Sequence, residues 1–134
     1  MDKKGNTMLA RSMLSFALLL AAACSNDGGK PSAPAESPAA TAKANEIFSQ
    51  RCTPCHGPEG RGNGPASATL TPKPRNFHDK TWQSQVTDDH IERIIQYGGS
   101  AVGKSAAMPA NPDLTGNREV VAALRNHIRT FKRD

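Results

Sequence analysis

The sequence predicts an all-α domain of three to five helices, on the basis of three observations. Apolar residues recur at helical spacings of three and four in three separate stretches of the chain's C-terminal two thirds. No stretch alternates apolar and polar residues over the length of a useful strand. The segments in between are rich in turn-forming residues, with 11 Gly and 10 Pro among 134 residues, which favours loops.

The N-terminal residues 1–23 are predicted to be a signal peptide. Lys3, Lys4 and Arg11 precede an apolar run over residues 13–23. As a helix this run would span roughly 16 Å, about half the hydrocarbon core of a bilayer, so it is too short to cross a membrane. The chain is therefore expected to be exported.

The end of the signal peptide resembles a bacterial lipobox, in which the cysteine becomes the lipidated first residue of the mature protein. The matching run is Leu20-Ala21-Ala22-Ala23-Cys24. The resemblance implies a lipid on Cys24 that holds the protein at the periplasmic side of a bacterial membrane, and Ser25 favours the outer membrane. Ala21 and Ala23 would also suit ordinary signal peptidase, and the alternative is a soluble periplasmic protein.

Residues 24–42 are predicted to be a flexible, lipid-anchored linker, and residues 43–134 the folded domain. The stretch 25–42 has no large apolar side chain to bury, so we expect it to stay extended. Its typical reach is roughly 20–25 Å. The folded domain is thus expected to swing above the membrane to which it is tethered.

Composition limits both the size of the core and the choice of partner. Only 37% of the residues are apolar and six are aromatic, so side chains alone make a thin core. We therefore expect something else to help fill it. From residue 24 onward there are 14 basic and 11 acidic residues, and the basic ones are scattered, which argues against a nucleic-acid partner. The length excludes a multidomain enzyme.

Three helices are predicted from capping signals and apolar spacing. The first carries a stripe that ends in two cysteines, with Thr41 as a possible cap. The second follows Thr87 and stops at Gly98, and the third follows Thr115 or Asn117. The stripes are Ala44, Ile47, Phe48, Cys52 and Cys55; then Ile91, Ile94 and Ile95; then Val120, Val121, Leu124, Ile128 and Phe131. Between the first two helices, the long Pro/Gly-rich stretch 56–86 is expected to wrap something, because a compact domain seldom carries so much loop.

The motif Cys52-Thr53-Pro54-Cys55-His56 indicates the chemistry of the chain, because C-x-x-C-H is the attachment signal for c-type haem. Two thiols three residues apart add to the two vinyl groups at one edge of the porphyrin. The imidazole of the next residue is then directed at the iron. We therefore predict one covalent haem c, with His56 as its proximal ligand.

Three other interpretations of the motif are weaker. A zinc site needs four ligands, and a fourth would have to come from a distant residue. A thioredoxin-like redox pair needs a preceding strand and a βαβ frame, whereas here an amphipathic helix precedes the motif. A disulfide between Cys52 and Cys55 would close a very small, strained loop.

The stretch from about Ala44 to Phe131 resembles the class I c-type cytochromes, in particular small bacterial monohaem cytochromes c. Phe48 and the small Ala44 stand four and eight residues before the first motif cysteine, as in the family's first helix. One departure is His127, which falls where the last helix usually has an aromatic residue. The resemblance implies a cytochrome c fold, with helices wrapped around one covalently attached haem.

The resemblance also suggests roles for residues in the long loop. The stretch Gly57 to Pro65 looks like the family's loop in which a proline carbonyl accepts the N–H of the proximal imidazole, which assigns that role to Pro65. Arg75, Asn76 and Trp82 are candidate donors to the haem propionates. For Trp82, plain core packing is an equal alternative.

Met108 is predicted to be the sixth ligand of the iron. The run Ser105-Ala106-Ala107-Met108-Pro109 looks like the family's axial Met-Pro segment, and Met108 is the one methionine left after removal of the signal peptide. It follows a glycine-containing loop, where packing into the core is a poor explanation for it. The rivals are His78, His90 and His127, of which His78 is the strongest.

A haem iron with both axial positions filled has no site for a substrate, so we predict electron transfer rather than enzymatic turnover. A neutral thioether ligand stabilises Fe(II) and raises the potential. The expected protein is a monomeric periplasmic carrier between a quinol-oxidising complex and a terminal oxidase or reductase. The alternatives are a haem sensor or peroxidase-like protein with a displaceable Met108, and a haem-free thiol oxidoreductase or metal carrier.

Overall fold

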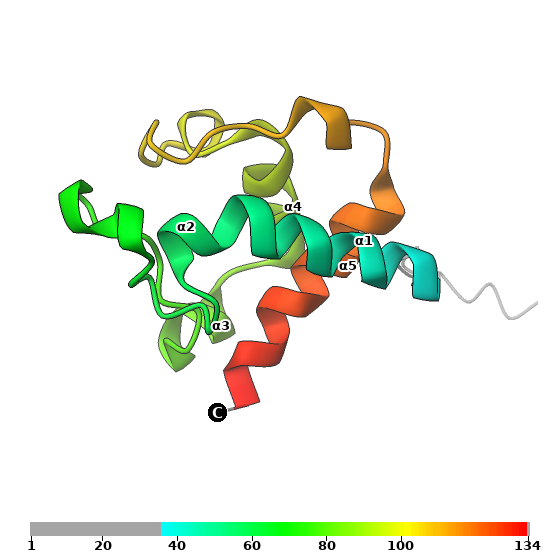
Figure 1. The fold of residues 1–134 in the computed structure, drawn as a ribbon, viewed down its shortest axis with the longest axis horizontal. Coiled ribbons are helices and arrows are strands. Elements are labelled where there is room, and N and C mark those ends of the chain that lie inside the picture. Colours follow the sequence, from blue (N-terminus) through cyan, green and yellow to red (C-terminus); the bar gives the residue numbers. More distant parts are fainter. Residues whose placement is uncertain (1–35, 134) are drawn as a thin grey trace, which may run out of the picture. The chain divides into compact units, whose positions relative to one another are not determined.

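The computed structural model describes residues 36–133, and this part of the chain contains helices and loops without a strand (Figure 1). The predicted all-α class is therefore confirmed. The predicted signal peptide, Cys24 and most of the predicted linker lie outside the described residues. The α-helices are α1 (Pro38–Ile47), α2 (Thr53–His56), α3 (Lys80–Gln85), α4 (Asp88–Tyr97) and α5 (Arg118–Thr130). A π-helical turn, η1 (Phe48–Cys52), and four 3-10 turns, η2 (Pro65–Thr69), η3 (Ser100–Val102), η4 (Pro112–Leu114) and η5 (Phe131–Arg133), complete the elements.

The first helix begins earlier than predicted, inside the segment expected to be linker. The linker was expected to run to residue 42, but α1 starts at Pro38, with Ser37 as its cap instead of Thr41. The Ser37 hydroxyl accepts a hydrogen bond from the backbone N–H of Ala40 at 3.2 Å. Proline suits the first helical position and alanine has the highest helix propensity. Ala40 is also buried, so this stretch packs even though it lacks large apolar side chains.

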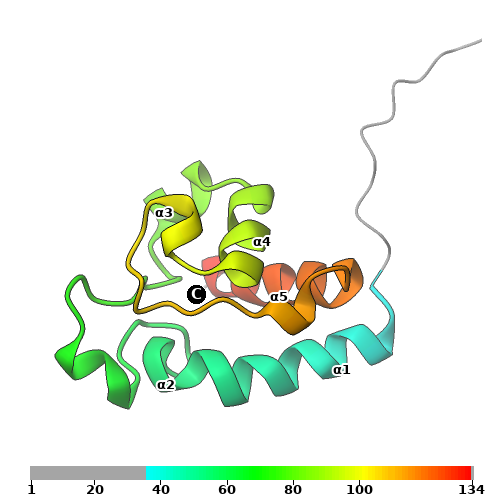
Figure 2. The same cartoon turned by 90° about the horizontal axis from the view of Figure 1, so that it is seen from above.

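The first helix runs without a break through η1 into α2, as Figure 2 shows. In η1 the backbone N–H of Thr53 bonds to the carbonyl of Phe48, five residues earlier. The Thr53 hydroxyl donates to the same carbonyl at 3.1 Å. Such π turns are rare and occur often at functional sites. This one ends at Cys52, the first residue of the C-x-x-C-H motif, and joins α1 to α2, which carries the rest of the motif.

The core lies where α5 crosses α1 (Figure 1). Ala44 is 1% exposed, and its small side chain lets the two helices approach closely. His127 of α5 occupies the position expected for an aromatic residue, and its ring packs on Phe48 with centroids 4.3 Å apart. Phe131 joins them, 5.8 Å from Phe48. The residue that departs from the family pattern thus still fills the helix crossing.

The predictions for α4 and α5 are confirmed close to their ends. The Thr87 hydroxyl accepts from the N–H of His90 at 3.2 Å, and α4 ends before Gly98, whose φ is +77°. The Asn117 side chain caps α5.

α3 was not predicted, because its sequence Lys-Thr-Trp-Gln-Ser-Gln has no apolar periodicity. The Asp79 side chain caps it by accepting a hydrogen bond from the backbone N–H of Trp82. Between residues 36 and 133 no helix is both long and apolar enough to cross a membrane.

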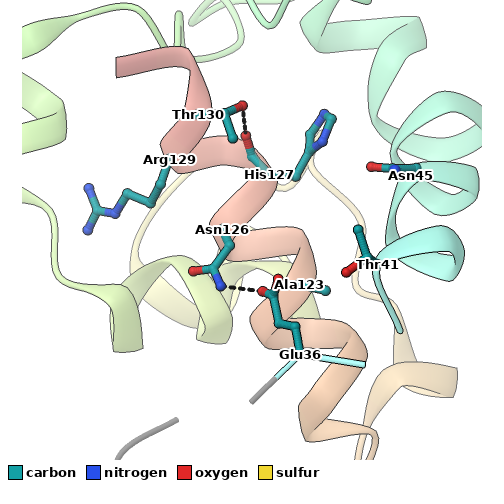
Figure 3. Close-up of a pocket in the computed structure, with 8 residues that line it drawn as sticks. All are labelled: Glu36, Thr41, Asn45, Ala123, Asn126, His127, Arg129 and Thr130. Carbon is teal, nitrogen blue, oxygen red and sulfur yellow. Dashed lines mark hydrogen bonds between the residues drawn. The ribbon is translucent and has the colours of Figure 1, made fainter. Parts of the chain in front are cut away.

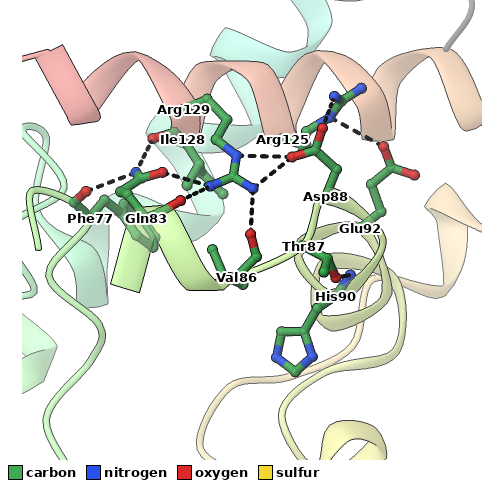
Figure 4. Close-up of polar contacts among 10 residues, drawn as sticks. All are labelled: Phe77, Gln83, Val86, Thr87, Asp88, His90, Glu92, Arg125, Ile128 and Arg129. Carbon is green, nitrogen blue, oxygen red and sulfur yellow. Dashed lines mark hydrogen bonds and ion pairs between the residues drawn. The ribbon is translucent and has the colours of Figure 1, made fainter. Parts of the chain in front are cut away.

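Two arginines of α5 hold the start of α4 (Figure 4). Arg129 donates from Nε and Nη2 to Oδ1 of Asp88 at 2.9 and 2.7 Å, and Arg125 donates to Oδ2 at 2.6 Å. Burial alone would raise the pKa of the Asp88 carboxyl, but the hydrogen bond from Arg129 and the charges of both arginines outweigh it, so the pKa is lowered. The ion pairs therefore stabilise the fold only while Asp88 is ionised.

We expect Asp88→Asn to lower the free energy of unfolding by about 1 kcal/mol at neutral pH, a value discounted because the carboxylate is half exposed. A lowered pKa means that the contribution of Asp88 is fully present above its pKa in the unfolded chain. It is lost as the pH falls through its lower pKa in the folded state. Urea titrations at several pH values measure this. A difference between parent and variant that persists in strong acid would contradict it.

Candidate functional site

The C-x-x-C-H residues lie together at the C-terminal end of the long first helix. Cys52 is the last residue of η1, and Cys55 and His56 belong to α2. Both cysteines are half-buried and neither forms a disulfide. Because they are three residues apart in a helical backbone, their side chains leave on the same side of it. This is the spacing that two neighbouring vinyl groups require.

The environment of Cys52 differs from that of a redox-active thiol. Burial raises the pKa of the Cys52 thiol to about 11, although the nearby charge of Arg51 acts in the opposite direction. Cys52 lies near the C-terminal end of the long first helix, and the partial negative charge of that end also disfavours a thiolate. Thiol oxidoreductases depend on a cysteine with a lowered pKa. The arrangement therefore argues against the haem-free oxidoreductase.

His56 is buried and held in the orientation of a metal ligand. Its Nδ1 lies 3.0 Å from the backbone oxygen of Arg75. A carbonyl oxygen only accepts, so Nδ1 carries the proton and Nε2 keeps a free lone pair for a metal. The ring of Phe77 stacks on the imidazole at 4.5 Å with an angle of 13°. Burial lowers the pKa of His56, with the Arg75 carbonyl opposing, which keeps the imidazole neutral. These features fit a proximal haem ligand.

The acceptor of the imidazole N–H was predicted to be the carbonyl of Pro65, and this prediction is wrong: it is that of Arg75. The backbone N–H of Gly64 bonds to the carbonyl of Cys55 at 3.0 Å, so the chain here runs along α2. From this point Pro65 starts the largely exposed turn η2, and the chain continues through it toward Arg75. The chain returns ten residues later. The loop's tertiary course decides the acceptor, although the second proline-rich stretch, 72–74, was a signal that could have suggested it.

Glycines let the loop close tightly under the motif. Beyond α2, the N–H of Gly62 bonds to the carbonyl of His56 at 2.8 Å, and Gly57 turns the chain with a φ of +78°. A Cβ on Gly64 would lie 2.4 Å from the backbone oxygens of Thr53 and Pro54. The backbone N–H groups of the loop can thus bond to the last carbonyls of the helix only because no side chain stands between the loop and the helix.

We expect Gly64→Ala to lower the free energy of unfolding by about 2–3 kcal/mol, because its Cβ would collide with backbone that cannot easily move. The matched control is Gly103→Ala. Gly103 has a positive φ of +68° but no atom within 4 Å of a new Cβ, so the substitution should cost about 1 kcal/mol. Urea unfolding followed by circular dichroism measures both. Equal losses would contradict the expectation.

The segment that carries Met108 is held by its backbone. The N–H of Met108 bonds to the carbonyl of Ser105 at 3.2 Å, and its own carbonyl accepts from the N–H of Gly99 at 2.9 Å. The Asn111 side chain donates to the carbonyl of Ile95 at 2.7 Å and so ties the segment to α4. The side chain of Met108 is half-buried. In both views this segment lies at the end of the domain where α2 lies (Figures 1 and 2). Axial ligation by Met108 remains a prediction.

The strongest histidine rival, His78, is engaged elsewhere. Its Nε2 donates to the carbonyl of Glu59 at 2.7 Å. His78 directly follows the segment 75–77, which contacts His56 on its Nδ1 side and stacks on its ring. A sixth ligand has to approach the iron from the opposite face, so this placement argues against His78. His90 lies in the first turn of α4, half-buried.

Arg75 contributes to the candidate site through its backbone. Its guanidinium pairs with Asp79 at 3.3 Å and lies over the ring of Trp82, 5.7 Å from the centroid. Trp82 is half-buried, and its ring is 5.8 Å from that of Phe77. Trp82 thus packs against the core, as the alternative interpretation had it. The propionate contacts proposed for Arg75 and Trp82 remain predictions.

Figure 3 shows a surface cavity of about 410 Å³ between the start of α1 and α5. Its walls include Thr41, Asn45 and His127, and the Asn126 amide bonds to Glu36 at its edge. None of the predicted haem-binding residues lines it. This cavity is therefore separate from the candidate site.

The comparisons with known proteins agree with the geometry of the site. A family model described as cytochrome c matches residues 41–132. The match thus covers the three predicted helices, the C-x-x-C-H motif and the segment of Met108. The comparison with curated proteins and the comparison with solved structures each gave no match.

Proposed function

Because this chain belongs to the cytochrome c family, and is thus a haem-based electron-transfer protein with covalently bound haem c, we propose that it is a periplasmic electron carrier. Cys52 and Cys55 hold the haem by thioether bonds, and His56 is the proximal ligand. The bound haem supplies a one-electron Fe(III)/Fe(II) couple. The observation that carries the proposal is the fixed tautomer of His56, whose Nδ1–H is committed to the Arg75 carbonyl.

The same hydrogen bond affects the strength of the ligand. A histidine that donates its second N–H to a carbonyl is more basic and better oriented than a free one. Here the bond is buried and Phe77 covers the ring. His56 therefore changes little in position or protonation as the charge on the iron changes. Such rigidity suits electron transfer, in which reorganisation slows the reaction.

We propose Met108 as the sixth ligand. Its support is the backbone of the segment: both the N–H and the carbonyl of Met108 are hydrogen-bonded, so that only the side chain has to be ordered when the thioether binds. With His56 and Met108 both bound, no position is left for a substrate. The thioether favours the reduced state and gives a moderately high potential.

An absorption spectrum with a pyridine haemochrome assay tests the proposal, on protein made together with haem-attachment machinery. We expect two thioether links, a six-coordinate low-spin spectrum, the weak long-wavelength ferric band of a thioether-ligated haem, and no binding of carbon monoxide. A high-spin spectrum that shifts with carbon monoxide would support the sensor or peroxidase-like alternative. A colourless, folded protein would contradict the proposal.

We further propose that the carrier is a monomer held at the outer membrane by a lipid on Cys24, and that it exchanges electrons with a quinol-oxidising complex and a terminal oxidase or reductase. The support is the signal-like N-terminus, which lies outside the described residues. Mass spectrometry of the mature N-terminus tests the lipid, with Cys24→Ala as the control. A mature chain without acyl groups would reject the lipid anchor and support the alternative, a soluble periplasmic carrier.

A further inference from the structure

A buried amide lies behind the segment that contacts His56. Gln83 of α3 is 2% exposed, and its Nε2 donates to the carbonyl of Phe77 at 2.8 Å and to the carbonyl of Ile128 at 3.0 Å (Figure 4). Both N–H groups of the amide are therefore used. The side chain joins the long loop to the C-terminal helix α5.

Arg129 completes the hydrogen bonding of this amide. Its Nη1 donates to Oε1 of Gln83 at 2.9 Å and to the backbone oxygen of the same residue at 2.7 Å. Its Nη2 donates to the carbonyl of Val86 at 2.8 Å. With its oxygen and both of its N–H groups bonded, the Gln83 amide has a single orientation, which a partly satisfied amide would lack.

The loop segment that Gln83 holds makes two contacts with His56. The Arg75 carbonyl accepts its Nδ1–H at 3.0 Å, and Phe77 stacks on its ring. Phe77 is attached on both sides of its Cα: its N–H bonds to the carbonyl of Gly60 at 2.7 Å, and its carbonyl accepts from Gln83. Phe77 is buried as well. The position of the imidazole thus depends on the anchoring of residues 75–77.

We propose that Gln83 is a positioning residue for the proximal ligand: together with Arg129 it holds residues 75–77 against His56 and keeps the bond from Nδ1 to the Arg75 carbonyl closed to water. The inference rests on the proposed role of His56 as a ligand. It explains why a polar side chain lies buried between a loop and α5, where an apolar one of the same volume would pack. It also makes α5 part of the control of the haem ligand, although the predicted haem contacts lie elsewhere.

The test is the rate at which the Nδ1 proton of His56 exchanges with solvent, measured by NMR on the reduced holoprotein. Gln83→Leu removes every hydrogen bond of the amide. Gln83→Glu keeps the shape and the contact with Arg129 but cannot donate to the two carbonyls. We expect exchange to be about tenfold faster in both, because two buried acceptors lose their donor.

The matched control is Ser37→Ala, which removes the cap of α1 at the end of the helix remote from Cys52. It destabilises the domain without touching residues 75–77, so exchange through global unfolding is separated from local opening. Exchange rates that rise equally in Gln83→Glu and Ser37→Ala, at equal loss of stability by urea titration, would overturn the inference.

A milder variant covers the case in which Gln83→Leu does not fold. Arg129→Lys keeps the charge but loses the two-pronged contact with Gln83, and we expect a smaller, measurable increase in the exchange rate. Unchanged exchange in both Arg129→Lys and Gln83→Glu would overturn the inference. The shifts of the His56 ring protons test the ligand itself. If the His56 ring protons show ring-current shifts from the haem but the Gln83 variants leave the exchange rate unchanged, only the positioning role is rejected. If the His56 ring protons show no such shifts, the proposed function is rejected.

Discussion

Replacing Cys52 and Cys55 together by alanine yields a protein that carries no thioether-bound haem and does not keep its fold. The buried apolar residues of the described part are few, and α2 with its loop is organised around the motif. We expect a loss of stability on the order of 5 kcal/mol, which is about all that a domain of this size has. Pyridine haemochrome spectra and the helical circular dichroism signal measure the two effects.

The single variants Cys52→Ala and Cys55→Ala serve as controls for the double variant. Each retains one thioether bond, so one vinyl group stays intact and the haemochrome band moves to longer wavelength. These variants should keep most of the helical signal. The interpretation would be wrong if the double variant were folded, cooperative in unfolding and active in electron transfer.

Replacing Met108 by alanine lowers the reduction potential on the order of 0.1–0.3 V, a part of the roughly 0.8 V range that axial ligands control. Loss of the thioether removes a ligand that favours Fe(II), and it leaves a position open to water. The ferric protein becomes high-spin and the ferrous protein binds carbon monoxide. Potentiometry and absorption spectroscopy measure these changes.

The control for Met108 is His78→Ala, because His78 is the strongest rival. Its ring lies on the proximal side and bonds to Glu59, so we expect the potential and the spectrum to remain those of the parent. A variant at position 108 that behaves like the parent, together with a shift in His78→Ala, would make histidine the sixth ligand.

The elements that the sequence predicted well are those with local signals. Thr87, Asn117 and Gly98 mark the ends of α4 and α5, and the apolar stripes of these helices face the core. Capping depends on residues three or four positions apart, so a short window contains the whole cause. α3 and the start of α1 lacked such a stripe. They are helical because Asp79 and Ser37 cap them and because each buries one side chain, Gln83 and Ala40, against the rest of the domain.

The candidate site likewise has one part that the sequence predicts and one part that it does not. The positions of the two thiols and of the imidazole relative to one another follow from the spacing in Cys52-x-x-Cys55-His56. The partner of that imidazole does not, since the Arg75 carbonyl reaches it only through a glycine loop that runs back along α2. The prediction of Pro65 is wrong because the loop continues for ten more residues before a backbone carbonyl, that of Arg75, reaches Nδ1 of His56.

The sequence by itself determined the class of the protein, the attachment motif and the order of the three main helices, because each of these is coded within a few neighbouring residues. The tertiary structure alone decided which carbonyl accepts the His56 proton, how His127 fills the helix crossing, and that Gln83 joins loop to α5. These contacts link residues 19, 79 and 45 positions apart. Their energies depend on burial and mutual orientation, which exist only once the chain has folded.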